Sequence, residues 1–287
     1  MLASGDPSVH LTLREIAPGV FVHTGSHVGT EHGDRANIGF IVGAKCVAVI
    51  DTGGSLATGR ALQATTKQRV SKPICYVINT HIHFDHVLGN AAFAAPNIEF
   101  IGHHNLAIAM TANEIFFTEQ FANELERSGP EIIIGTTKTV AGEVMLDLGE
   151  RNIVLRAHAT ADTNADLTVF DVQTSTLWTG DLVFIERLPI LDGSLRGWLA
   201  WFDKVEAQSI ARIVPGHGPA SAIWPSGGEA AHVYLKALLN DGRKAIEDGI
   251  FLEDAMDSMS ADAAVMWLVN DRHRSNVSKA YGELEWE

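Results

Sequence analysis

Six consecutive residues of this chain contain three histidines and one aspartate, in the order His81-Ile82-His83-Phe84-Asp85-His86. His81 and His83 are two positions apart, so in an extended segment their side chains point to the same side. Asp85 and His86 are adjacent and must diverge, which suits a second metal beside the first. Imidazole and carboxylate groups are typical ligands of zinc and similar divalent ions. We therefore interpret this stretch as a metal-binding motif.

The motif stands where a strand is expected to give way to a loop. Residues 73–79 form an apolar run that is typical of a buried strand, and residues 87–93 are suited to begin a short helix. Ligands at such a junction have a rigid base and still converge on one point. The alternative interpretation is a polar loop that happens to be rich in histidine. The strand–loop setting disfavours that alternative, because a motif in its expected context is stronger than a bare pattern match.

Three more polar residues follow apolar, strand-like runs. Asp51 stands in Val49-Ile50-Asp51-Thr52-Gly53, Asp181 in Trp178-Thr179-Gly180-Asp181, and His217 in Pro215-Gly216-His217-Gly218. Together with His-x-His-x-Asp-His, and in this order, they resemble the signature of the metallo-β-lactamase superfamily over residues 15–220. The resemblance implies an α/β (α+β) fold, built as a four-layer αβ/βα sandwich.

A closer resemblance is to the SoxH-like group of quinoprotein relay system zinc metallohydrolases. It rests on three stretches, which are residues 36–43 (ANIGFIVG), 191–199 (LDGSLRGWL) and 283–287 (ELEWE). This resemblance implies a zinc hydrolase that is exported to the periplasm. Residues 1–7 lack the basic region and apolar core of a signal peptide, so a cytoplasmic location is the alternative.

The superfamily resemblance also implies two metal sites that share a bridging carboxylate. It assigns His81 and His83 to the first site, and Asp85, His86 and His217 to the second. Asp181 would bridge the two sites, and Asp51 would support the ligands without binding metal. One ligand of the first site departs from the family pattern. The usual stretch, laid without gaps on residues 158–167, puts Asp162 where a ligand histidine belongs and His158 on an earlier histidine that binds no metal. We favour Asp162, a competent zinc ligand, and keep His158 as the alternative.

Two divalent ions at such a site predict hydrolysis by a metal-bound hydroxide. The expected cofactors are two Zn²⁺, with iron or manganese as alternatives, and the expected catalytic residues are Asp85 and Asp181. The substrate is expected to be a small molecule with an ester, thioester, lactone or amide carbonyl. The alternatives are a β-lactamase-type activity, an iron-dependent enzyme similar to persulfide dioxygenases, and a non-catalytic binding protein. By the resemblance, Asp181 favours thioesterases, lactonases and general hydrolases, because β-lactamases of this fold generally lack the bridging aspartate.

Contacts to the substrate are predicted less directly. His103 follows a predicted strand, and Phe117 lies on a predicted helix at the family's lid position. Arg187 and Arg196 are candidates for an anionic group of the substrate, with ordinary surface arginine as the alternative. His103 with His104 opens a helix, and adjacent side chains on a helix do not face one ion.

Composition limits the partners. The chain has 287 residues, 35 acidic and 21 basic, and a formal net charge of −14. A nucleic-acid partner requires the opposite sign, so nucleases of the superfamily are disfavoured. No segment approaches the ~20 apolar residues of a membrane span, so no membrane insertion is expected.

Periodicity and turn residues predict the elements. An N-terminal extension (1–14) precedes one hydrolase domain (15–287) with C-terminal helices. Strands are expected at 37–42, 46–50, 73–79, 98–102, 139–147, 152–157, 166–172, 176–179 and 212–214, after a hairpin at 11–24. Helices are expected at 55–69, 106–127, 195–209, 226–249 and 270–285. Cys46 and Cys75 open two strands that the fold makes neighbours, and whether they pair is left open.

Overall fold

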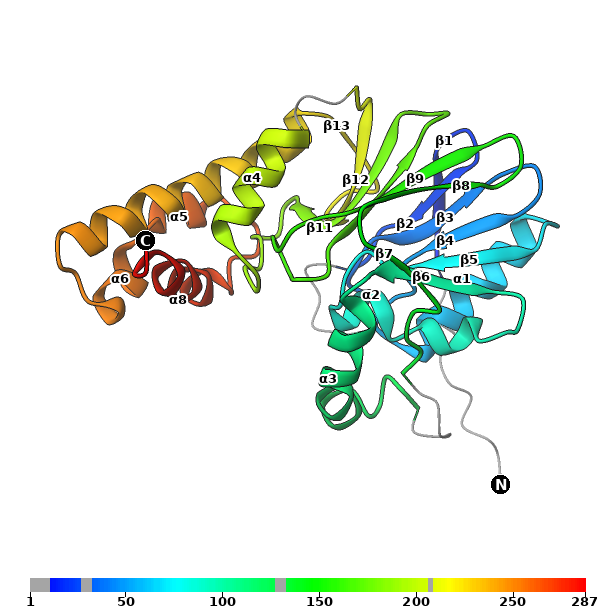
Figure 1. The fold of residues 1–287 in the computed structure, drawn as a ribbon, viewed down its shortest axis with the longest axis horizontal. Coiled ribbons are helices and arrows are strands. Elements are labelled where there is room, and N and C mark those ends of the chain that lie inside the picture. Colours follow the sequence, from blue (N-terminus) through cyan, green and yellow to red (C-terminus); the bar gives the residue numbers. More distant parts are fainter. Residues whose placement is uncertain (1–10, 27–32, 127–132, 206–208) are drawn as a thin grey trace.

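Two β-sheets lie face to face at the centre of the protein, and helices cover the outer face of each sheet (Figure 1). The computed structural model describes residues 11–26, 33–126, 133–205 and 209–287. Three parts of the predicted elements lie outside these ranges. They are residues 1–10 of the N-terminal extension, residue 127 of the predicted helix 106–127, and residues 206–208 of the predicted helix 195–209. The layers are those of the predicted αβ/βα sandwich, so the fold prediction is confirmed.

The first sheet contains seven strands in sequence order. They are β1 (Leu13–Ala17), β2 (Val20–His23), β3 (Ile38–Val42), β4 (Val47–Ile50), β5 (Ile74–Ile78), β6 (Glu99–His103) and β7 (Lys138–Val140). Strands β1 to β4 are antiparallel neighbours, and β4 to β7 are parallel. Helix α1 (Leu56–Arg69) connects β4 to β5, as a parallel pair requires. The Ser55 hydroxyl caps it by accepting a hydrogen bond from the Thr58 N–H at 3.0 Å.

The second sheet has six strands in the order β13-β12-β11-β10-β9-β8. They are β8 (Glu143–Asp147), β9 (Asn152–Ala157), β10 (Leu167–Asp171), β11 (Thr176–Phe184), β12 (Arg212–His217) and β13 (Ala222–Ile223). Strands β11 and β12 are longer than predicted and include Asp181 and His217. These two strands are parallel, so their carboxyl ends meet at one edge of the sheet.

The single strand predicted at 139–147 is wrong, because the chain divides there into two strands of different sheets. Strand β7 pairs with β6 in the first sheet, and β8 pairs with β9 in the second. Ala141 and Gly142 separate them. The run of β-forming residues is continuous in sequence, so it contains no signal for the change of sheet.

Three groups of buried side chains separate the four layers. Residues such as Ile50, Ile78, Leu155 and Trp178 fill the space between the sheets. Leu62 of α1 packs with Val49, Val77 and Phe93 on the outer face of the first sheet. The outer face of the second sheet is covered by α4 (Leu195–Val205) and α5 (Glu229–Glu247), through Trp198, Phe202 and Leu235.

A buried ion pair ties the two sheets together. The Arg151 guanidinium donates to both carboxylate oxygens of Asp171 on β10, at 2.9 and 2.6 Å. It also donates to the carbonyls of Pro18 and Val42, which belong to the first sheet and its β1–β2 turn. A bidentate arginine pair with further hydrogen bonds from the guanidinium is the geometry in which a buried charge is tolerated.

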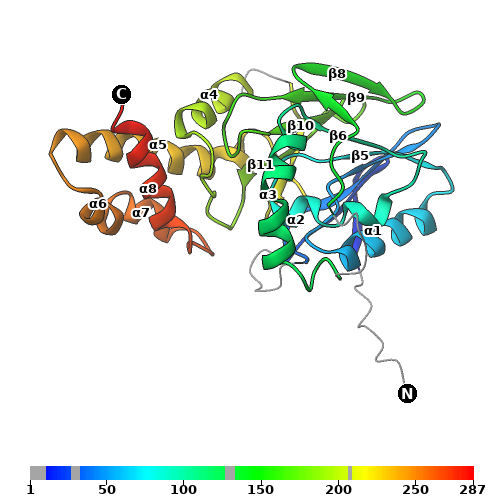
Figure 2. The same cartoon turned by 60° about the horizontal axis from the view of Figure 1, so that its bottom comes forward.

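The C-terminal helices extend away from the sandwich and pack on one another (Figure 2). Helices α5 and α8 (His273–Leu284) match the predicted helices 226–249 and 270–285. Two short helices between them, α6 (Leu252–Ser258) and α7 (Ala261–Val265), were not predicted. They bury Ala255 and Ala264 against this group, so packing rather than local sequence stabilises them. Within the described ranges, no helix has the length and apolar character needed to cross a bilayer.

Cys46 and Cys75 lie on the neighbouring strand starts of β4 and β5 and are free thiols. Burial, together with a hydrogen bond between Cys46 and Cys75, raises the pKa of the Cys46 thiol to about 12. The Cys46 thiol is therefore protonated at neutral pH and lies in contact with Cys75.

Candidate metal centre

The predicted metal motif lies where strand ends from both sheets meet. Strand β5 ends at Ile78 and leads directly to His81 and His83. The short helix α2 (Phe84–Val87) then holds Asp85 and His86 in its first turn. From the second sheet, β11 contributes Asp181 and the end of β12 contributes His217.

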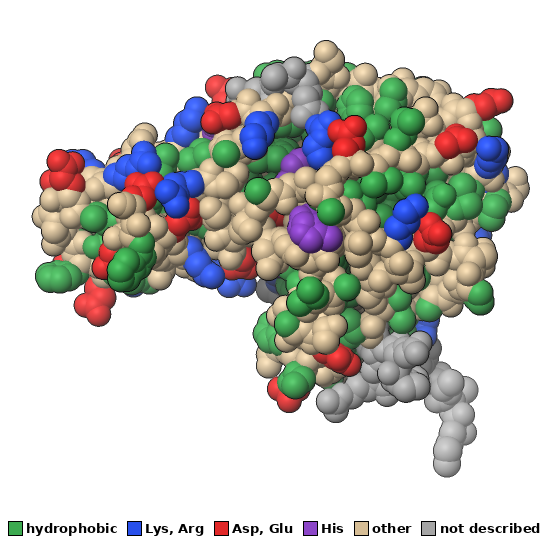
Figure 3. Space-filling model, viewed as in Figure 1, with side chains coloured by type: hydrophobic (Ala, Val, Ile, Leu, Met, Phe, Trp, Pro, Cys, Tyr) green, Lys and Arg blue, Asp and Glu red, His purple; other side chains and the backbone are tan. Residues whose placement is uncertain are grey.

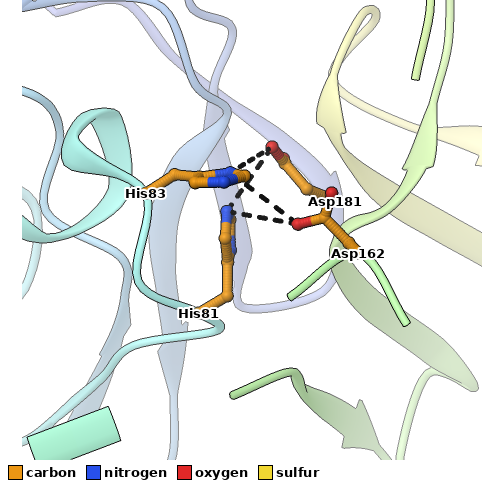
Figure 4. Close-up of side chains that lie close together, drawn as sticks. All are labelled: His81, His83, Asp162 and Asp181. Atoms are coloured by element: carbon orange, nitrogen blue, oxygen red, sulfur yellow. Dashed lines mark ion pairs between the residues drawn. The ribbon is translucent and has the colours of Figure 1, made fainter. Parts of the chain in front are cut away.

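Four side chains form a first cluster (Figure 4). The His81 Nε2 atom lies 3.4 Å from Asp181 Oδ2 and 3.9 Å from Asp162 Oδ2. The His83 Nδ1 atom lies 3.5 Å from Asp181 Oδ2 and 3.7 Å from Asp162 Oδ2. Two imidazole nitrogens and two carboxylate oxygens thus face one point.

A second cluster contains Asp85, His86 and His217. The His217 Nε2 atom lies 3.4 Å from Asp85 Oδ2 and 3.4 Å from Asp181 Oδ2. The His86 Nε2 atom lies 3.2 Å from Asp181 Oδ1. Asp181 therefore contacts members of both clusters, as a bridging carboxylate must. Gly216 makes room for it, because a Cβ at that position would collide with Asp181 Oδ1.

The donor set fits divalent metal ions. In tetrahedral coordination, metal–ligand bonds of about 2.1 Å place two ligand atoms about 3.4 Å apart, which is close to the separations here. Several of these atoms are buried and make no hydrogen bond within the described part of the chain: Nε2 of His81 and His86, both carboxylate oxygens of Asp162, and Oδ1 of Asp181. Buried polar atoms without hydrogen bonds are costly, and metal ligation removes that cost.

Asp51 supports the metal motif through hydrogen bonds to His86 and Thr80. Its Oδ2 lies 2.8 Å from His86 Nδ1, which leaves Nε2 of that ring to face the cluster. The same carboxylate accepts from the Thr80 N–H and hydroxyl, each at 2.8 Å. Thr80 Oγ1 is in turn 3.0 Å from His81 Nδ1, so Asp51 orients two of the ring nitrogens that face metal.

The other two histidines are oriented by different partners. His217 Nδ1 lies 3.2 Å from the carbonyl oxygen of Arg35 and donates to it, so Nε2 is the acceptor that faces the cluster. His83 Nε2 lies 3.1 Å from a carboxylate oxygen of Asp192, so this ring presents Nδ1 to the cluster. Sequence reasoning missed Asp192, which stands in a stretch used only for the family resemblance. No spacing rule connects it with His83, because it comes from a distant loop.

The charged side chains of the two clusters shift one another's pKa values. Burial would lower the pKa of His86, but the carboxylates of Asp181 and Asp51 outweigh it and hold the pKa well above its usual value. Burial raises the pKa of Asp162 well above its usual value. Burial also lowers the pKa of His81 to about 4, with a contribution from His86. Burial therefore disfavours the charged forms of Asp162 and His81, whereas nearby carboxylates favour the charged form of His86.

Of the two candidates for the last ligand of the first site, Asp162 lies in the cluster. His158 lies elsewhere, with its Nε2 2.8 Å from the Thr168 hydroxyl. Burial lowers the pKa of His158 to about 3, so this ring is neutral. The loop that carries Asp162 is fixed by Asp166, which accepts hydrogen bonds from the Thr163 N–H and hydroxyl.

The predicted substrate residues are less close to the clusters. Both ring nitrogens of His103 are hydrogen-bonded. Nε2 contacts the His158 carbonyl oxygen, and Nδ1 accepts from the Asn105 N–H. Phe117, on α3 (Leu106–Gln120), is buried in a core group with Val87 and Phe121 beneath the metal motif. Arg196 pairs with Glu283 and Glu287, each at 3.2 Å. These contacts give the three residues roles in the fold.

The chain belongs to the metallo-beta-lactamase superfamily, whose sequence profile matches residues 33–217. These residues contain every member of both clusters. Family and site together make the chain a metal-dependent hydrolase. The closer SoxH-like relationship stays a prediction.

A curated relative is similar to the chain in sequence, and solved structures are similar to it in fold. The human acyl-coenzyme A thioesterase MBLAC2 is 23% identical over 219 residues, which are 65% of this chain and 74% of the relative. A double mutant of the sec-alkyl sulfatase PisA1 superposes with a TM-score of 0.75 at 14% identity, over 94% of this chain and 50% of that chain. A metallo-beta-lactamase from Pontibacter korlensis has a TM-score of 0.64 at 20% identity, over 79% of this chain and 99% of that one.

The two structural matches differ in what they cover. The match to the sulfatase leaves only about 6% of this chain outside, so it includes most of the C-terminal helices. The chain spans half the length of that sulfatase. The shared architecture therefore extends beyond the sandwich.

Proposed function

We propose that this protein is a binuclear zinc hydrolase that cleaves activated acyl bonds, with thioesters as the first candidate substrates. The observation that carries the proposal is the pair of clusters joined by Asp181, in which several buried ligand atoms have no hydrogen-bond partner among the described residues. The first ion would be held by His81, His83, Asp162 and Asp181, and the second by Asp85, His86, His217 and Asp181. Two such ions supply Lewis acidity and lower the pKa of a bound water to near neutrality.

The chain itself positions the ligands. Asp51 keeps a proton on His86 Nδ1, and the Arg35 carbonyl does the same for His217, so both rings bind through Nε2. Asp192 contacts Nε2 of His83, so this ring would bind through Nδ1. Asp85 is 5% exposed and faces His217. With a second ion bound there, its carboxylate would orient the attacking water. No protein nucleophile is required for this chemistry.

The thioester preference is supported by a curated relative and by the bridging aspartate. The relative is an acyl-coenzyme A thioesterase, and 74% of its length matches. A β-lactamase-type activity is the alternative, supported by solved lactamases of the same fold. An iron enzyme of the persulfide dioxygenase type needs two histidines and one aspartate at one iron, and Asp162 in place of a histidine alters the first site.

A substrate panel on zinc-loaded protein tests the proposal. Butyryl-coenzyme A, a neutral butyryl thioester, a lactone and the β-lactam nitrocefin are compared at equal concentration, with the metal-stripped protein as control. We expect the thioesters to be hydrolysed fastest, with loss on chelation and recovery with zinc. Hydrolysis of the β-lactam alone, or oxygen consumption by an iron-loaded form, would contradict the assignment. So would a covalent acyl-enzyme on a side chain.

A further inference from the structure

The connecting segment, residues 189–194, forms the last part of the link from β11 to α4 and lies against the first metal cluster. The Asp192 carboxylate lies 3.1 Å from His83 Nε2. The Asp192 N–H donates to the carbonyl oxygen of Asp162 at 3.2 Å. One residue of the segment therefore contacts two residues of the first cluster. These two follow β5 and β9, which belong to different sheets.

The connecting segment is packed backbone against backbone on the loop that carries Asp162. The Ser194 N–H donates to the Ala161 carbonyl oxygen at 2.8 Å. A Cβ atom at Gly193 would collide with the same oxygen, and one at Gly197, in the first turn of α4, would collide with another carbonyl oxygen of that loop. Glycine is required at both positions because the two backbones approach so closely. A shift of the segment would therefore move the loop with it.

The C-terminal helix α8 holds the end of the segment through the carboxylate of Glu283. This carboxylate accepts from the Ser194 hydroxyl at 2.9 Å and from the Leu195 N–H at 2.6 Å. Leu195 begins α4, so its N–H has no partner within that helix. A carboxylate at this position satisfies the N–H and is also favoured by the helix dipole. Glu283 thus caps α4 from a different helix.

A second contact comes from Asn276, which lies seven positions before Glu283 and on the same face of α8. Its buried side chain accepts from the Leu191 N–H at 2.9 Å and donates to the Pro189 carbonyl at 2.6 Å. Together, Asn276 and Glu283 hold the connecting segment on both sides of Asp192. The helix therefore fixes the residue that contacts a predicted metal ligand.

These contacts join two stretches that are far apart in the sequence. Residues 191–199 and 283–287 are two of the three stretches on which the closer family resemblance rests. The superfamily profile matches residues 33–217, so it includes the first stretch and ends before α8. The bonds from Glu283 to Ser194 and Leu195 give the two stretches a common role at the first metal cluster.

The alternative role for Glu283 is an ordinary surface ion pair. Acidic and basic side chains stand next to one another over the C-terminal helices in Figure 3, and Glu283 pairs with Arg196 at 3.2 Å. The Arg196 side chain is 54% exposed, so this pair should contribute little. The Glu283 side chain is 18% exposed, and its bonds to the connecting segment are independent of the arginine.

We propose that Glu283 is a positioning residue for the first metal site. Its carboxylate fixes the connecting segment, and the segment in turn holds Asp192 against His83 and supports the loop that carries Asp162. The inference rests on the proposed metal centre, but it does not depend on which substrate is cleaved. It makes α8, which lies outside the superfamily profile, a part of the machinery that holds the first ion.

The second site provides an internal comparison. Asp51 contacts His86, and the Arg35 carbonyl contacts His217. Neither Asp51 nor Arg35 belongs to the connecting segment. Loss of the Glu283 carboxylate should therefore weaken the binding of the first ion and leave the second unaffected, whereas a general loss of stability should weaken both.

The experiment separates the sites by using two single-site proteins of full length. His217→Ala should keep zinc at the first site, and Asp162→Ala should keep it at the second. Glu283→Gln is added to each, and the zinc dissociation constant is measured by competition with a chelating dye. Glutamine preserves the side-chain length, but its amide nitrogen cannot accept the bond that one carboxylate oxygen accepts from Ser194 or Leu195.

We expect Glu283→Gln to weaken zinc binding at the first site by about tenfold, the lower end of the range for residues that support metal ligands. At the second site the affinity should change by less than about twofold. The visible absorption of cobalt-loaded His217→Ala protein gives a spectroscopic readout of the first site. Its band should change when Glu283→Gln is added, because the orientation of His83 is altered.

Tyr281→Phe is the matched control on the same helix. It removes a hydroxyl that donates to the Ile250 carbonyl at 2.8 Å, a contact that does not involve the connecting segment. It should leave the first-site affinity and the cobalt spectrum unchanged. Ser194→Ala is a milder second variant, which removes one bond to Glu283 and should weaken the first site in the same direction even if Glu283→Gln fails to fold.

Three results would overturn the inference: unchanged first-site affinity in Glu283→Gln and Ser194→Ala, equal losses at the two sites, or an equal loss in Tyr281→Phe. Absence of zinc binding in His217→Ala would contradict the metal centre and the inference with it. If zinc binds as expected but no acyl substrate is hydrolysed, the proposed reaction fails while these titrations still decide the role of Glu283.

Discussion

At the scale of single residues, Asp162 distinguishes this centre from the usual ligand pattern of its superfamily. With Asp85 and Asp181 it gives three carboxylates against the four positive charges of two divalent ions. A histidine at this position would leave two carboxylates. The extra anion should make the first ion a weaker Lewis acid and leave its bound water more basic. It also adds an oxygen ligand, which lowers the preference for zinc over manganese or iron.

Substitution of the two candidates for the third ligand should separate them. Asp162→Ala removes a buried carboxylate of the first cluster, so it should weaken first-site metal binding by more than the 10–100-fold typical of a lost supporting contact. His158→Ala should keep the metal, because that ring contacts Thr168 instead. Metal content after dialysis measures both. An empty first site in His158→Ala with a filled one in Asp162→Ala would reverse the assignment.

Asp162→His restores the usual ligand type. With one carboxylate fewer, the first ion becomes a stronger Lewis acid, so zinc should bind more tightly and the basic limb of the activity profile should move to lower pH. The measurements are a zinc competition titration and a pH–kcat/KM profile. A shift of the limb to higher pH would contradict this charge argument.

At the scale of elements, the ends of β5, β11 and β12 position the ligands, and the Arg151–Asp171 pair holds the two sheets in register behind them. Both side chains of this pair are almost fully buried. Such a pair adds little net stability compared with apolar residues, but loss of one partner leaves an uncompensated charge. Its main effect is to fix how the two sheets face each other.

Arg151→Ala should therefore lower the free energy of unfolding by about 3–5 kcal/mol. Arg156→Ala is the matched control, because Arg156 pairs with Glu143 at the surface, and its loss should cost less than about 1 kcal/mol. Denaturant unfolding of the metal-stripped proteins gives both values. Equal losses in the two variants would show that the buried pair has no special role.

The family resemblance implied the sandwich, and apolar runs predicted most strands, because such runs are local signals. It also predicted which residues gather at the strand ends. It did not predict the division of 139–147 between two sheets, nor α6 and α7, because tertiary packing decides both. Asp192 was missed for the same reason. Its partner His83 is 109 positions away, and no local pattern joins them.

At the scale of the whole molecule, the metal centre links the two halves of the sandwich. The first sheet supplies His81, His83, Asp85 and His86 through the β5–α2 junction, and the second supplies Asp162, Asp181 and His217. Metal ions bound there would contact residues from both sheets at once. They would also neutralise carboxylates whose burial is otherwise unfavourable.

Removal of the metal should therefore destabilise the whole fold rather than one loop. Ions that bind only the folded state stabilise it by mass action, by about 4 kcal/mol when the free metal is 1,000 times the dissociation constant. For a domain of this size, each 1 kcal/mol corresponds to roughly 2–4 °C in Tm. We expect chelation to lower the Tm by about 10 °C and zinc to restore it. An unchanged Tm would indicate that no metal bridges the sheets.

The central claim is a binuclear site, and metal stoichiometry tests it most directly. Elemental analysis of zinc-loaded, dialysed protein should give about two ions per chain. His217→Ala, which removes a ligand of the second site only, should retain about one and lose hydrolysis. A wild-type value that stays at one ion with all seven side chains intact, or an unchanged value in His217→Ala, would contradict the account.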